Sequence, residues 1–162
     1  MARLIALSLL LLSLVLPLNA ASASSYLEKI DYTLTNQSDG DFHNQDLEGS
    51  SFAGAVARNA DFSGALLHGA IFTQGAFAGA DFRGADLSDA LMDRADFVGT
   101  NLENANLSGV IASGSSFADA SITGADFSNA LLDREDQVRL CRQAKGVNPT
   151  SGISTKESLD CR

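Results

Sequence analysis

The sequence has few of the side chains from which catalytic and metal sites are usually built. Its 162 residues include two His, two Cys and no Trp, and only 11 basic residues against 20 acidic ones. His43 and His68 stand far apart, and no GxSxG, HExxH or phosphate-binding glycine loop is present. We therefore expect a non-enzymatic protein without a bound cofactor.

The two cysteines, Cys141 and Cys161, have neither a CxxC spacing nor a neighbouring His, so they cannot complete a tetrahedral metal site. The glycine-rich nonapeptide of calcium-binding β-helices is also missing, and no metal site is expected. A redox or metal role is the alternative for this pair. In an exported protein an even pair most simply forms a disulfide, which here would close a loop of about 20 residues and contribute roughly 3 kcal/mol in the chain-entropy model.

Residues 1–23 are typical of a cleavable secretory signal. A positive start is followed by an apolar run from Leu4 to Leu18 and by the small residues Ala21-Ser22-Ala23. A membrane anchor is the rival interpretation, but the run is short for a bilayer and nothing charged or aromatic follows it closely. We expect export by the general secretory route, with no membrane span after cleavage.

Charge is unevenly distributed along the predicted mature chain. Residues 40–134 hold 13 acidic residues against four Arg, whereas residues 135–162 hold four acidic residues against five basic ones. The middle of the chain is therefore acidic and its tail nearly neutral.

One apolar position recurs every five residues from Phe42 to Leu132. Its 19 sites hold all nine Phe of the chain, six Leu, Met92, Ile122 and two Ala. Ala is favoured two residues before these sites, and Gly two residues after them. A period of five fits neither the 3.6 residues of a helical turn nor the alternation of a flat strand.

A square coil accounts for this period. The large residue and the Ala two positions earlier point to the same side of an extended backbone, while the residues between such pairs face water and let the chain turn. If each unit turns by a quarter circle, four units close a coil of 20 residues, and coils stack about 4.8 Å apart. A helical repeat is the alternative, but each regular Gly would cost a helix about 0.5 to 1 kcal/mol.

Several units match the pattern A(D/N)(L/F)XX in full, among them 80–84, 85–89, 105–109 and 125–129. In these residues the sequence resembles the pentapeptide repeat family. The resemblance implies an all-β fold, a right-handed quadrilateral parallel β-helix. It covers residues 40–134, or about five coils.

Stacking of coils predicts which residues share a face, because residues 20 apart lie above one another. The four axial columns would be Phe42, Phe62, Phe82, Leu102 and Ile122; Leu47, Leu67, Leu87, Leu107 and Phe127; Phe52, Phe72, Met92, Ala112 and Leu132; and Ala57, Phe77, Phe97 and Phe117. Ala112 would leave a gap, which Val110 at the neighbouring core position would fill.

Both ends of such a coil need covers, because they expose apolar side chains and unpaired backbone. We expect residues 24–39 to form an N-terminal cap segment. The acidic sequence at 133–136 predicts the start of a helix and Lys145-Gly146 its end, so 134–145 is predicted to be a capping helix. Residues 135–162 would comprise this cap and a tail closed by the disulfide.

The position before each large residue faces outward, and two opposite columns of it differ in character. The acidic face comprises Asp41, Asp61 and Asp81, followed by Asn101 and Ser121. The opposite column runs Ser51, Ile71, Leu91, Ile111 and Leu131. We define Ile71, Leu91, Ile111 and Leu131 as the apolar stripe, a candidate interaction surface. The alternative is that the tail or the N-terminal segment covers it.

Two classes of function follow. An exported scaffold or protein-interaction module is favoured, because the signal, the short rod and the two-Cys tail together resemble the lumenal pentapeptide repeat proteins of cyanobacteria and chloroplasts. The absence of a long Ser- and Arg-rich transit region favours a bacterial source, hence the thylakoid lumen or the periplasm. The alternative is an acidic rod that mimics DNA, as in the gyrase-binding pentapeptide proteins, which would require a cytoplasmic location. We expect a protein partner rather than nucleic acid, and a monomer or weak self-association.

Overall fold

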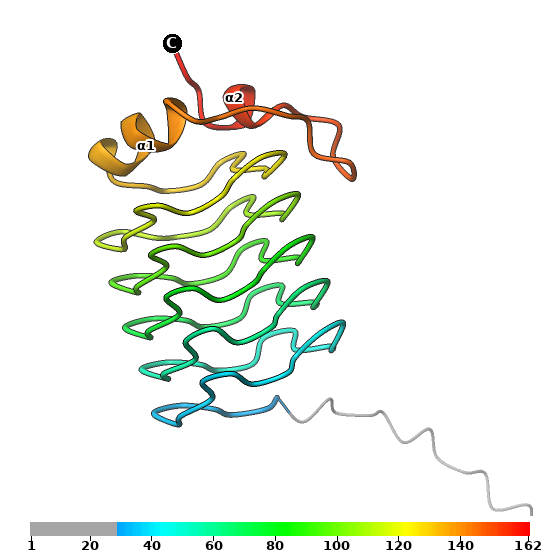
Figure 1. Ribbon diagram of the computed structural model, residues 1–162, viewed down its shortest axis with the longest axis vertical. Helices are drawn as coiled ribbons and strands as arrows, with labels where there is room; N and C mark the ends of the chain where they lie inside the picture. The colour runs from blue at the N-terminus through cyan, green and yellow to red at the C-terminus, as the bar shows by residue number, and fades with distance from the viewer. Residues whose placement is uncertain (1–28) are drawn as a thin grey trace, which may run out of the picture.

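The chain winds as a stack of coils closed at one end by two short helices (Figure 1). This computed structural model describes residues 29–162, so the predicted signal lies outside the described residues. Seventeen parallel bridges join residues 20 apart, from Asp31↔Ser51 to Ile111↔Leu131. One hundred residues separate Asp31 from Leu131, which is five coils of 20. The bridges are isolated, and no longer strand forms within residues 29–162.

Each five-residue unit ends in a tight turn. In the unit that contains Phe82, the backbone N–H of Ala85 donates to the carbonyl of Phe82 at 3.0 Å, and Gly84 has a φ of +65°. A positive φ at the third residue is typical of a type II turn, which favours Gly and tolerates Asn and Asp. This requirement explains the Gly that recurs two residues after the core position.

Asp and Asn recur before the core position because their side chains support the next turn. The carboxylate of Asp81 accepts from the backbone N–H of Arg83 at 3.0 Å, and Asp96 accepts likewise from Val98 at 3.0 Å. Asn106 does the same for Ser108 at 3.1 Å. These local bonds replace ladder partners that the turn cannot supply.

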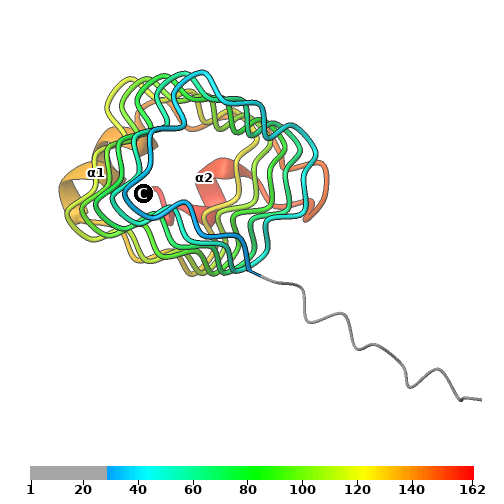
Figure 2. The same ribbon diagram turned by 90° about the horizontal axis from the view of Figure 1, so that it is seen from below.

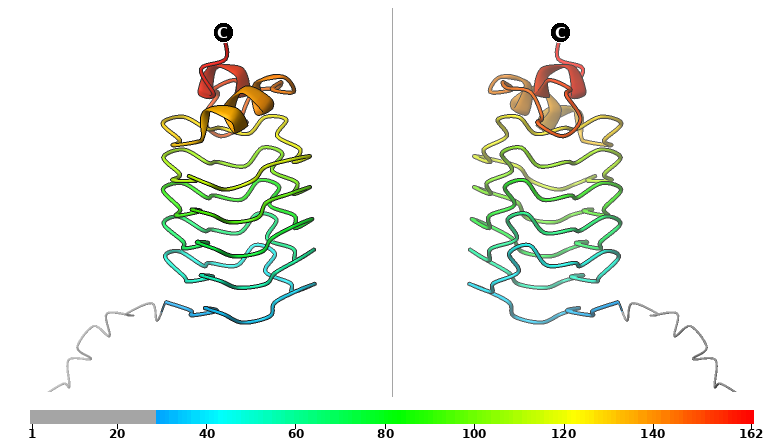
Figure 3. Two further views of the ribbon diagram at one scale, coloured as in Figure 1. Left: turned by 90° about the vertical axis from the view of Figure 1, so that its left-hand side faces the viewer. Right: turned by 90° about the vertical axis from the view of Figure 1, so that its right-hand side faces the viewer.

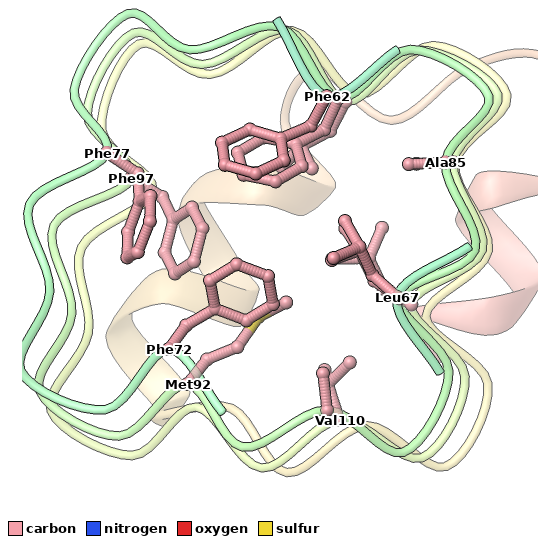
Figure 4. Close-up of a cluster of buried hydrophobic side chains, with 14 of the residues drawn as sticks. Phe62, Leu67, Phe72, Phe77, Ala85, Met92, Phe97 and Val110 are labelled. Atoms are coloured by element: carbon pink, nitrogen blue, oxygen red, sulfur yellow. The ribbon is translucent and has the colours of Figure 1, made fainter. Parts of the chain in front are cut away.

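The large residues fill the axis in the predicted columns (Figure 4). The rings of Phe42 and Phe62 are stacked with centroids 4.6 Å apart, and those of Phe62 and Phe82 are 4.7 Å apart. In the fourth column Phe97 stacks on Phe77 at 5.2 Å. The prediction that residues 20 apart lie above one another is thus confirmed.

The gap left by Ala112 is filled as expected. Val110 and Ala112 are both buried, and Val110 points into the same core as Phe72 and Met92 in Figure 4. A larger residue at one core position thus compensates for a smaller one at its neighbour, as close packing requires.

The coil begins earlier than the sequence pattern suggested. Asp31 and Asn36 already bridge to the next coil, and the ring of Tyr32 stacks on Phe52 at 4.7 Å. Residues 31–39 are therefore part of the first coil, and the boundary at 40 is placed too late. The pattern was hidden because Gln37 occupies an axial position, where its amide donates to the hydroxyl of Thr35 at 3.2 Å.

The C-terminal cap contains α1 (Arg134–Cys141) and α2 (Thr155–Ser158), which lie across the last coil (Figures 2 and 3). Leu140, Ala144 and Leu159 are buried against the end of the core. Cys141 and Cys161 form the expected disulfide. The helix is shorter than the predicted 134–145, because the chain leaves it to hydrogen-bond along the exposed edge of the coil.

The edge of the last coil is held by backbone and amide groups of the tail. The carbonyl of Lys145 accepts from the N–H of Gly124 at 2.9 Å. The buried amide of Asn148 donates to the carbonyls of Gly124 at 2.9 Å, Ala105 at 3.2 Å and Asn104 at 3.3 Å. Gly124 has no further coil above it, and Lys145 and Asn148 bond to it where the next coil would lie, so the tail ends the stack.

Candidate interaction surface

The apolar stripe forms a continuous row on one face of the coil. Bridges join Ile71 to Leu91, Leu91 to Ile111 and Ile111 to Leu131, so the four side chains occupy four successive coils. Leu91 is 37% exposed and Leu131 58%, and the two Ile are half-buried. At about 4.8 Å per coil the row is roughly 14 Å long.

The C-terminal tail does not fold over this row. Its buried residues Leu140 and Leu159 pack on the end of the coil, and both helices lie there rather than along the side (Figures 1 and 3). The alternative that the tail covers the stripe is therefore wrong, because the apolar end of the axis offers the tail more surface to bury. The stripe keeps its exposed area within the structure of residues 29–162.

The acidic face lies on the opposite side and is partly neutralised. Bridges place Asp41, Asp61 and Asp81 above one another. The hydroxyl of Ser63 donates to Asp61 at 2.5 Å, and this bond, with that from the Ser63 backbone N–H, lowers the pKa of the Asp61 carboxyl. Arg83 donates to Asp81 at 2.6 Å, and this hydrogen bond raises the pKa of the arginine. The column has no carboxylate beyond Asp81, so its charge covers three coils only.

Stacking also brings each histidine beside a serine, which motif searches do not detect. Nδ1 of His43 lies 2.9 Å from Oγ of Ser63, and Nδ1 of His68 lies 3.0 Å from Oγ of Ser88. In both cases the serine hydroxyl donates to an aspartate two residues earlier. Because its proton points to the carboxylate, neither hydroxyl is activated by its histidine as a nucleophile would be. The arrangement occurs twice at equivalent repeat positions, so the repeat geometry explains it.

Neither a metal site nor a membrane-spanning helix is found in residues 29–162. No three His, Cys, Asp or Glu side chains in this range gather so that they could hold an ion. Neither α1 nor α2 has the length and hydrophobicity that crossing a bilayer requires.

The cap carries a second surface that sequence reasoning missed. A groove of about 570 Å³ is lined by Arg134, Arg142 and Arg162, and a neighbouring groove of about 510 Å³ by Arg142, Lys145 and Lys156. The signal for it was present in the tail, where Glu135 and Asp136 precede Arg139 at helical spacing and pair with it. Because Arg139 pairs with both acidic residues, the other basic residues of the cap outnumber the acidic residues that are left near them.

A family model for pentapeptide repeats matches residues 41–74, 76–109 and 100–134. The chain belongs to the pentapeptide repeat family. Membership in this family identifies the coil as a right-handed β-helix. It also confirms the resemblance to pentapeptide repeat proteins that the repeating units indicated.

A solved member of the pentapeptide repeat family is similar over most of the chain. This protein from the thylakoid lumen of Arabidopsis thaliana is 40% identical, with a TM-score of 0.78, and the match covers 80% of this chain and 90% of that one.

More distant structures of the family are also found. A pentapeptide repeat protein from Nostoc is 20% identical with a TM-score of 0.43, the match covering 74% of this chain and 85% of that one. The plasmid-mediated fluoroquinolone resistance protein QnrB1 is 20% identical with a TM-score of 0.39, the match covering 66% and 64%. Neither similarity is high enough to carry an argument. No curated protein matches the sequence.

Proposed function

We propose that this protein is a non-enzymatic scaffold that acts outside the cytoplasm and binds a protein partner through the apolar stripe. The observation that supports the proposal is the exposure of Leu91 and Leu131 in one continuous row along the rod. Aliphatic side chains stacked in this way form a rigid hydrophobic surface. Because the rod is already ordered, a partner can bind this surface without the entropy cost of ordering it.

The size of the stripe favours a modest affinity. A row roughly 14 Å long is much smaller than the ~800 Å² per partner of a standard stable interface. A partner that covers only this row would bind transiently, and a second copy of the chain would associate weakly. We therefore propose a monomer, or a weakly self-associating protein, that holds its partner loosely.

Three observations support a location in the thylakoid lumen or periplasm of a cyanobacterium. The sequence predicts a secretory signal at residues 1–23. The disulfide between Cys141 and Cys161 is typical of oxidising compartments outside the cytoplasm. The relative that is 40% identical comes from the thylakoid lumen of a plant. Fractionation of the native host with an antibody tests the location.

The geometry gives less support to mimicry of DNA. A duplex carries one negative charge per about 1.7 Å of its axis, along its whole length. The acidic face holds three carboxylates, of which Asp81 is paired with Arg83. The supercoiling activity of gyrase, measured with added protein, tests this alternative, and inhibition at submicromolar concentration would support it.

Crosslinking from the stripe tests the proposed interaction. A photoreactive amino acid at Leu91 or Ile111, expressed in the native host, should give the same discrete crosslinked protein. A matched substitution at Asp41, on the opposite face and outside the cap, should not. The purified partner should then bind the wild-type rod and lose binding to Leu91→Asp, which leaves the buried core unchanged. Equal crosslinking from Asp41, or undiminished binding to Leu91→Asp, would show that the stripe is not the contact.

A further inference from the structure

We infer that the two grooves of the cap form a binding site for an acidic, extended peptide segment of another protein. This inference does not depend on the function proposed for the stripe, because the grooves lie at the end of the rod and share no residue with the stripe. The two grooves meet at Cys141 and Arg142, which line both. Each has a volume within the range of small-ligand pockets, and together they cross the C-terminal end of α1.

The positive charge of the grooves is free to meet a ligand. Arg134, Arg142, Lys145 and Lys156 have no carboxylate within ion-pair distance in the described part of the chain. Arg139, by contrast, is committed to Glu135 at 3.0 Å and to Asp136 at 3.3 Å. The pairs of Arg139 consume two of the four acidic residues of the tail.

Few carboxylates oppose this charge. Asp160 lines the first groove, where its carboxylate lies 3.9 Å from Arg162, and Glu103 lines the second. Each groove thus presents three basic side chains against one acidic side chain. In a protein of net charge −9, this excess concentrates the positive potential at one end of the molecule.

The negative charge of the rod determines which class of anionic ligand can bind in the grooves. Residues 40–134 hold 13 acidic residues against four Arg, so a bilayer or a nucleic acid long enough to extend past the cap would be repelled by the coil below it. A short segment that stays within the grooves avoids that repulsion. The lining also offers an apolar contact from Val138, whose side chain is 47% exposed. An extended peptide that alternates acidic and aliphatic residues fits both features.

Fluorescence anisotropy with a labelled peptide of alternating Glu and Leu tests the inference, using the full chain with its disulfide intact. A peptide with Gln in place of Glu is the matched control. We expect binding of the Glu peptide that weakens with salt, and at least tenfold weaker binding of the Gln peptide. Absence of binding by the Glu peptide, or equal binding of the two peptides, would overturn the inference.

Charge reversal locates the site. Arg142→Glu should weaken binding of the Glu peptide by about tenfold or more, because this exposed side chain lines both grooves. Lys156→Glu, in the second groove, provides an independent variant should the first disturb the cap. The control is Arg58→Glu, an equal charge change on the exposed rod, about four coils or roughly 19 Å from the cap. It should change binding less than about twofold at 0.15 M salt, where the Debye length is about 8 Å.

Further results of these binding measurements test the location of the site and the class of its ligand. If Arg142→Glu and Lys156→Glu bind the peptide no worse than Arg58→Glu does, the grooves are not the site and the inference is wrong. If vesicles containing phosphatidylglycerol, or a DNA duplex, bind at the same ionic strength while the peptide does not, the ligand class is wrong. Unchanged peptide binding by Leu91→Asp would confirm that the site is separate from the stripe.

Discussion

Replacing Phe82 by Ala tests the stacked core at its centre. The side chain is fully buried, and its ring stacks on that of Phe62 at 4.7 Å. The rings of Phe72 and Phe97 contact it from the sides, with centroids 6.0 and 5.8 Å away. The change therefore removes an aromatic ring that touches neighbours in its own column and in two others.

The expected loss of stability follows from how little the surroundings can relax. Phe→Ala substitutions in protein cores cost about 3 to 5 kcal/mol, and the cost is larger where the cavity cannot collapse. The neighbouring residue Asp81 is bridged to Asp61 below and to Asn101 above, so the backbone around the cavity is held on both sides. For the 134 described residues, 3 to 5 kcal/mol corresponds to a fall in Tm of about 10 to 18 °C.

Denaturant and thermal unfolding, followed by circular dichroism, measure this loss. Leu91→Ala is the matched control, because it removes a large apolar side chain from an outward position nine residues, or nearly two units, further along the chain. It should cost less than about 1 kcal/mol, since the side chain is already 37% exposed. A loss below 1 kcal/mol for Phe82→Ala, or equal losses for the two variants, would refute the axial placement of Phe82.

Three further predictions concern the cap and the acidic face. Asn148→Ala should destabilise by about 1 to 3 kcal/mol and increase amide exchange in the tail, because the hydrogen bonds from its buried amide to the carbonyls of Gly124, Ala105 and Asn104 are lost. Replacing Cys141 and Cys161 by Ser should lower the free energy of unfolding by roughly 3 kcal/mol in denaturant melts, with the circular dichroism of the coil unchanged. The pKa of Asp61 is lowered chiefly by Ser63, so the stability it contributes is present above its usual pKa of 3.8 and is lost as pH falls below that value toward the folded pKa. Asp61→Asn should flatten this part of the curve of stability against pH, and an unchanged curve would contradict the assignment.

The coil was predictable because its rule is local and strictly repeated. Each unit must place one large side chain inward and one small residue beside it, and must turn with a positive φ at a position that Gly, Asn or Asp tolerates. Once four units close a coil, a step of 20 residues gives every stacked pair, including Phe62 on Phe82. The same step places Ser63 above His43, a contact that motif searches overlook because it follows from register.

The ends were less predictable because they break that rule. Gln37 occupies an axial position in the first coil, where the repeat pattern calls for an apolar residue, so the pattern did not reveal this unit. The hydroxyl of Thr35 accepts a hydrogen bond from the Gln37 amide and so satisfies this polar group. At the other end, helix propensity extends beyond Cys141, yet the chain leaves the helix to pair the Lys145 carbonyl with Gly124. That bond belongs to the edge of the coil, and nothing within the tail sequence specifies it.

The period, the identity of the core residues and the disulfide pair were determined by sequence alone, since each depends on spacing along the chain. Only the tertiary structure decided that the tail, predicted to cover the end of the axis, leaves the stripe exposed. It also decided that Arg134, Arg142 and Lys156 gather around two adjoining grooves. Such outcomes depend on competition between surfaces for burial and on which charges remain unpaired after folding, and both are properties of the folded molecule.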